Sequence, residues 1–262
     1  MAGDGREGAG LTAAGDSAAG HASITHDQLP RAMTHTASDP DRHSWLHFAT
    51  RSGEEGRRWA EEYRRDRSVE ELSEQSLLLL RRRRYEEGNE LLARAAESLE
   101  AVQGPERSVR SVMERWYYGV LGYSLYCLDE FDRAEQVMMQ AHEAVTAAVG
   151  EHRVLLPLAN HCHEFRLHRA RIARNRCRWE EMRSHVEEVR GMLEGRLPFC
   201  VLQDGSPVWI STIRAFHTSL PGLTEEERGS LSGLLEDAVL LRHFEQFVHG
   251  MYRVPGVVIP YP

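Results

Sequence analysis

The chain has 262 residues, of which 41% are hydrophobic and 27% charged, an ordinary soluble composition that is long enough to bury a sizeable core. Its formal net charge of -8 disfavours general binding to nucleic acid or to an anionic membrane surface. All 32 basic residues are arginine, because the sequence contains no lysine. This excludes enzymes that need a lysine Schiff base, a phosphate-loop lysine or a lysine general base.

Residues 1–43 are rich in Gly, Ala, Ser, Thr and Asp and show no hydrophobic periodicity. Such a segment cannot bury enough apolar surface to offset its loss of conformational entropy, so we predict that it is disordered. The N-terminus has no hydrophobic signal core, and no stretch approaches the roughly 18 apolar residues of a membrane span. We therefore expect a cytoplasmic protein that does not bind membranes.

Ordered structure is predicted to begin near Ser44, with a short amphipathic helix or helix pair around Trp45 and Trp59. Ser68, with Glu71 three residues later, forms a capping box that predicts the start of the next helix.

That helix ends in an arginine tetrad at 81–84, and a further helix is predicted over 85–102. Positive side chains at a helix C-terminus suit the backbone dipole, which is the structural explanation of the tetrad. A site for phosphate or for an acidic partner is the alternative. Gly104 and Pro105 then separate these helices from the central part of the chain.

The stretch 118–141 reads as two helices joined by a tight turn, and the rest of the chain is organised around it. Each helix carries one stripe of large and small side chains at helical spacing. The small residues leave room for the two backbones to approach closely. The first stripe is Tyr118, Leu121, Gly122 and Leu125, and the second is Phe131, Ala134, Met138 and Ala141.

This pattern resembles a tetratricopeptide repeat, with an aromatic residue, Leu-Gly, an aromatic residue after the turn, and Ala at the close-packing points. A long helix over 155–178 follows, and Trp179 occupies the aromatic position after its turn. Tyr85, Phe131 and Trp179 are 46 and 48 residues apart, which exceeds the roughly 34 residues of a standard repeat. The resemblance implies an all-α fold of antiparallel helix hairpins, a divergent α-solenoid over residues 44–253.

The C-terminal part is less regular. A hairpin around Asp204 and Gly205 is one interpretation, but we prefer a helix that starts at Ser206 and Pro207. A last helix is predicted over 224–248. The apolar, proline-rich tail at 254–262 is expected to be extended and to pack back on the solenoid, with insertion into a partner's groove as the alternative.

Helical repeats bind their partners on the concave face formed by the first helix of each pair. Aromatic rings beside arginines on that face form a plausible cradle for an extended peptide with acidic groups, because guanidinium groups bind carboxylates in a bidentate manner. Core tyrosines and a solvated arginine face are the structural alternative. The candidate residues that the resemblance implies are Trp116, Tyr123, Tyr126, Leu167, Arg171, Arg174 and Asn175.

The competing hypothesis is a metal- or haem-dependent small-molecule enzyme on an all-α scaffold. His161, Glu164 and His168 lie on one stretch of helix and offer two imidazoles and a carboxylate, a ligand set that suits zinc or non-haem iron. The outer two are roughly 10 Å apart along the axis, however, and the stretch matches no known metal motif. We therefore favour a non-catalytic scaffold, adaptor or regulator that binds a peptide or protein partner and needs no cofactor.

Overall fold

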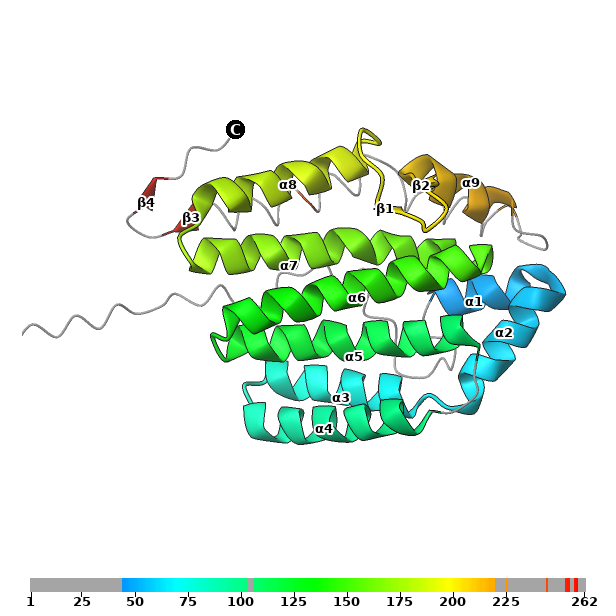
Figure 1. The fold of residues 1–262 in the computed structure, drawn as a ribbon, viewed down its shortest axis with the longest axis horizontal. Coiled ribbons are helices and arrows are strands. Elements are labelled where there is room, and N and C mark those ends of the chain that lie inside the picture. The colour runs from blue at the N-terminus through cyan, green and yellow to red at the C-terminus, as the bar shows by residue number, and fades with distance from the viewer. Residues whose placement is uncertain are drawn as a thin grey trace, which may run out of the picture.

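The computed structural model describes residues 44–102 and 106–219, together with Glu225, Phe244, 253–254 and 257–258. This part of the chain is mostly helical (Figure 1). The predicted disordered segment 1–43 lies outside the described residues, as do most of the predicted last helix and most of the C-terminal tail.

The described chain begins with a helix pair, α1 (Ser44–Arg51) and α2 (Gly53–Arg65). The two helices approach so closely that a Cβ atom on Gly56 would lie 2.1 Å from the carbonyl oxygen of Ala49. Trp59 and Tyr63 of α2 are buried and stack with their ring centroids 5.4 Å apart. The indole N–H of Trp59 donates to Ser108 Oγ at 2.9 Å and so ties α2 to the centre of the molecule.

Three further helix pairs form the body of the protein, and the two helices within each pair contact one another. They are α3 (Ser68–Arg81) with α4 (Tyr85–Ala101), α5 (Arg107–Cys127) with α6 (Phe131–Glu151), and α7 (His161–Asn175) with α8 (Trp179–Leu193). Figure 1 shows them stacked in the order α4, α3, α5, α6, α7, α8. Each second helix begins at the aromatic residue predicted for that position, Tyr85, Phe131 or Trp179.

The turn inside each pair has the same conformation. Its central residue, Arg83, Asp129 or Cys177, adopts a positive φ of 61°, 60° or 56°. The amide of the next residue then bonds the carbonyl five residues earlier, at 3.0 Å, 2.9 Å and 2.8 Å in the three turns. This is a left-handed helix C-terminus of the Schellman type. The conformation therefore recurs at the 46- and 48-residue spacing seen in the sequence.

The small residues of the central pair lie where the two helices are closest, as predicted. Ala134 and Ala141 are fully buried, and a Cβ on Gly122 would lie 2.7 Å from the terminal methyl group of Met138. Gly88 has the same role between α3 and α4, where a Cβ would lie 2.9 Å from Leu80.

Two helix starts differ from the prediction. Ser68 is the first residue of α3 and not its cap, because Arg67 occupies the N-cap position; the Asp66 carboxylate accepts bonds from the amide and the hydroxyl of Ser68 at 3.0 Å and 2.7 Å. The helix predicted over 155–178 is divided, since the 3-10 helix η3 (Arg153–Asn160) precedes α7. Pro157 lies inside η3 and has no N–H group for an α-helical bond.

The preferred interpretation of residues 206–209 as the start of a helix is wrong. β1 (Cys200–Val201) and β2 (Pro207–Val208) form an antiparallel hairpin, and α9 (Ile210–Ser219) follows. The Asp204 carboxylate accepts the Ser206 amide at 2.8 Å, so it orders the turn instead of a helix. In the tail, β3 (Arg253–Val254) and β4 (Val257–Val258) pair antiparallel.

Candidate binding surface

The C-terminal ends of α3, α5 and α7 lie at one end of the helical stack, where the three tight turns follow them (Figure 1). Here the side chains of α5 meet those of α7. The Asn175 amide donates to the hydroxyl of Tyr126 at 3.0 Å. The Tyr123 ring lies 6.5 Å from the ring of Tyr126 and meets the His168 ring edge-on, also at 6.5 Å. Two aromatic residues of one helix thus contact two polar residues of another.

Three arginines come together around these tyrosines. Burial lowers the pKa of Arg171, and the neighbouring cations Arg174 and Arg81 lower it further. Arg81 and Arg174 make no hydrogen bond or ion pair with any other residue in the part of the chain that the structure describes. Positive charge is therefore concentrated here, and neither Arg81 nor Arg174 forms an ion pair with an acidic residue among the described residues. We call this group the Tyr–Arg surface, defined as Arg81, Tyr123, Tyr126, His168, Arg171, Arg174 and Asn175.

The other arginines of α7 and its turn are paired with acidic residues of α6 and α8. Arg166 binds Glu188 at 2.7 Å, and Arg169 binds Glu135 at 3.1 Å. These ion pairs explain why α7 carries arginines at positions where a repeat helix has apolar residues. Arg166 and Arg169 therefore form ion pairs, whereas Arg81 and Arg174 of the Tyr–Arg surface form none among the described residues. Helical spacing in the sequence does not reveal this difference.

The structure brings together most of the predicted partner-binding residues, but with different exposure. Tyr123 is only 5% exposed, so its ring packs against neighbouring side chains and is not accessible to a partner. Trp116 and Leu167 pack partly against the core, and the guanidinium of Arg115 lies 4.1 Å from the Trp116 ring centroid. Arg81 was not among the predicted binding residues, although the arginine tetrad was the signal that could have found it.

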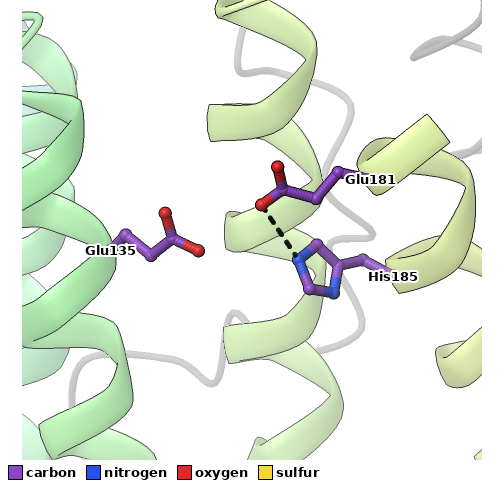
Figure 2. A group of neighbouring side chains, drawn as sticks. All are labelled: Glu135, Glu181 and His185. Carbon is purple, nitrogen blue, oxygen red and sulfur yellow. Dashed lines mark ion pairs between the residues drawn. The ribbon is translucent and has the colours of Figure 1, made fainter. Parts of the chain in front are cut away.

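The structure places His161, Glu164 and His168 in two different surroundings. His161 Nδ1 lies 2.9 Å from a Glu164 oxygen and 2.8 Å from Nη2 of Arg115, whereas His168 contacts Tyr123 on the Tyr–Arg surface. Among the described residues, potential metal ligands converge elsewhere, at Glu135, Glu181 and His185 (Figure 2). The predicted metal site at His161, Glu164 and His168 therefore has no geometric support in this part of the molecule.

Electrostatics explain why Arg115, His161 and Glu164 cluster. Burial alone would raise the pKa of Glu164, but His161, His163 and Arg115 outweigh it and hold that pKa far below its usual value. Burial, followed by the charge of Arg115, lowers the pKa of His161, while Glu164 acts in the opposite direction. An ionised carboxylate thus compensates a buried guanidinium across α5 and α7. The charges of Arg115 and Glu164 thus offset one another, and the group links α5 to α7.

The clearest pockets of the described residues lie away from the Tyr–Arg surface. One, of about 440 Å³, lies between α3 and α4 and is lined by residues that include Ser68, Glu71 and Arg94. A smaller one lies along α2. In the described ranges, no helix combines the length and the apolar character needed to cross a membrane.

No protein-family model matches this sequence, and comparisons with curated proteins and with solved structures find no similar protein. The class of protein is therefore inferred from the contacts between its own helices. It is a mostly helical protein in which adjacent helices pack in pairs, an arrangement compatible with a helical repeat.

Proposed function

We propose that this chain is a non-catalytic scaffold, adaptor or regulator that binds an acidic segment of a peptide or protein partner on the Tyr–Arg surface. We also propose that its paired helices form a divergent tetratricopeptide-like solenoid, with α3, α5 and α7 lining the recognition face. The recurrence of one turn conformation at spacings of 46 and 48 residues supports the repeat. The location of the surface on the first helix of each pair supports its role in binding.

The observation that carries the proposal is the unbalanced charge at Arg81 and Arg174. Both lie near Arg171, yet neither has an acidic partner among the described residues, whereas Arg166 and Arg169 of the same region do. Repulsion between like charges is unfavourable, and a carboxylate from a partner would relieve it through charge-assisted hydrogen bonds. The half-buried Tyr126 supplies an apolar ring and a hydroxyl beside these cations.

A metal- or haem-dependent enzyme built on the helix from His161 to His168 is less well supported. His161 and Glu164 interact with Arg115, and His168 belongs to the Tyr–Arg surface. The group of potential metal ligands found among the described residues is a different one, Glu135, Glu181 and His185.

The proposal can be tested by fluorescence anisotropy with a labelled octaglutamate peptide and the full chain. We expect saturable binding, and we expect Arg81→Ala and Arg174→Ala each to weaken it at least about fivefold, since a hydrogen bond to a charged group contributes about 1.5–3 kcal/mol. Arg94→Ala is the matched control, because Arg94 is exposed on α4 and is also unpaired among the described residues.

An octaglutamine peptide of the same length separates charge recognition from non-specific adhesion. Equal affinity for the two peptides, or an equal effect of Arg94→Ala and Arg174→Ala, would contradict the proposal.

A further inference from the structure

A second group of polar side chains lies between α6 and α8, away from the Tyr–Arg surface. Glu135 comes from α6, whereas Glu181 and His185 lie one turn apart on α8. Figure 2 shows the three side chains pointing toward one another across the space between these helices. One oxygen or nitrogen atom of each residue lies within 4.8 Å of the corresponding atoms of the other two.

His185 is the member of this group that lacks ordinary partners. It is only 5% exposed, and both of its ring nitrogens are buried without a hydrogen-bond partner among the described residues. Its nearest acidic atom, a Glu181 oxygen, lies 3.8 Å from Nε2, which is too long for a hydrogen bond. Leaving such a group unsatisfied costs about 1–3 kcal/mol, so the imidazole would be stabilised by a ligand that the described residues do not supply.

His152, which is less buried, contrasts with His185 in the same molecule, because it forms a hydrogen bond with Glu55 and an ion pair with Glu106. Its Nδ1 lies 2.9 Å from Glu55, and its Nε2 lies 2.9 Å from Glu106. His152 therefore has a carboxylate on each nitrogen, whereas His185 has two carboxylates nearby and a hydrogen bond to neither.

Two arginines, Arg169 and Arg178, hold the carboxylates of this group in place. Arg169 donates to Oε1 of Glu135 from Nε and Nη2, at 3.2 Å and 3.1 Å. Arg178 Nη1 lies 2.6 Å from Oε2 of Glu181, and its Nη2 lies 3.6 Å from Oε2 of Glu135. The Glu181 oxygen nearest to His185 is thus the one that Arg178 does not bind. Carboxylates that bind a metal are commonly fixed by hydrogen bonds of this kind.

We propose that Glu135, Glu181 and His185 bind one divalent transition-metal ion, of which Zn²⁺ is the representative, and that the ion links α6 to α8. Two carboxylate oxygens and one imidazole nitrogen suit Zn²⁺, whereas Mg²⁺ and Ca²⁺ prefer oxygen ligands alone. Ligand atoms on a tetrahedral zinc ion are roughly 3.3 Å apart, so small rotations of the side chains bring these atoms into range. The partly exposed glutamates leave room for water as the fourth ligand.

The charges near the group are consistent with this chemistry. Burial lowers the pKa of His185, and Arg169 and Arg166 act in the same direction, while Glu188 and Glu181 oppose them. Because Arg169 and Arg178 offset the negative charges of the two carboxylates, we expect the site to bind zinc with moderate affinity. We do not expect it to bind every cation through negative charge alone.

The test is calorimetric titration of the full chain with ZnCl₂ at pH 7, after dialysis against EDTA. The histidines of the N-terminal segment can bind further zinc, so the result is the difference between variants. We expect Glu181→Gln and His185→Ala each to lose one equivalent of zinc, or to bind it at least tenfold more weakly. His152→Gln is the matched control and should retain that equivalent. MgCl₂ should give no saturable heat at this site.

Zinc should also raise the melting temperature of the wild type and of His152→Gln, but not that of Glu181→Gln. Glu181 is partly exposed, and glutamine has the same shape as glutamate, so we expect Glu181→Gln to fold. This variant therefore tests the proposal even if His185→Ala does not fold. Identical zinc stoichiometry and affinity in the wild type and Glu181→Gln, or no zinc binding by the wild type, would overturn the proposal. Neither result bears on octaglutamate binding, so the two proposals fail separately.

Discussion

His142 lies on α6, where the charges of Arg166 and Arg169 on α7 reach it. Burial, together with these two cations, lowers the pKa of His142 to about 4. In the unfolded chain an imidazole has a pKa of about 6.5. Between these values the unfolded chain binds a proton that the folded chain does not, so stability falls as the pH drops from about 6.5 toward 4.

We therefore expect His142→Gln to lose less stability on acidification than the wild type. The difference between pH 7 and pH 5 should be about 1 kcal/mol, after allowance for solvent screening of a half-buried group. Urea unfolding of both proteins at the two pH values measures it. The prediction fails if the two proteins lose the same free energy of unfolding, because other histidines would then account for the acid sensitivity.

The arginines of α7 illustrate what could be predicted at the residue scale. Their number and their concentration on one helix pointed to a charged surface, and Arg171 and Arg174 do belong to one. The sequence did not indicate that Arg166 and Arg169 are neutralised by Glu188 and Glu135. Such pairing depends on which faces of separate helices meet, and that information is not local.

The three tight turns offer a test at the scale of the element. Cys177 is exposed and adopts a φ of 56°, where a side chain with a Cβ atom is strained. We expect Cys177→Gly to raise the free energy of unfolding by about 1 kcal/mol, because glycine adopts this conformation without strain. Cys177→Ala, which removes the thiol but keeps the Cβ atom, should have little effect. Equal changes in the two variants, measured by urea unfolding, would contradict the explanation.

The boundaries of the elements were predictable where a local cause sets them. The aromatic residues after the turns marked the starts of α4, α6 and α8, because they begin the stripe that packs on the first helix. Prediction failed at Ser68 and at Ser206. In both places an aspartate two residues earlier accepts the serine amide and decides the local geometry. Ser and Asp both occur at helix caps and in tight turns, so the sequence pattern does not tell which of these roles each residue takes.

At the scale of the whole molecule, a buried charge links the first helices to the body. Glu70 is fully buried, accepts the Tyr63 hydroxyl at 2.7 Å, and binds Nε and Nη2 of Arg67 at 2.9 Å and 2.8 Å. We expect Glu70→Ala to lower the free energy of unfolding by about 3 kcal/mol or more, since it leaves Arg67 without its carboxylate. Thermal and urea unfolding both report this change.

Glu87→Ala is the matched control for that prediction. Glu87 pairs with Arg84 at the same i,i+3 spacing but is exposed, so its loss should change stability little. Comparable losses in the two variants would show that burial is not what makes the Glu70 network important.

By itself, the sequence determined the helical character of the protein, the three helix pairs and their close contacts, because helix periodicity, small residues and turn spacing are properties of neighbouring residues. It also pointed to α5 and α7 as the helices that carry candidate binding residues. Only the tertiary structure decided that Arg81 joins them, that Tyr123 is buried, and that His185 faces Glu135 from another helix. Those relations follow from how distant helices pack, since the residues of the Tyr–Arg surface range from Arg81 to Asn175 along the chain.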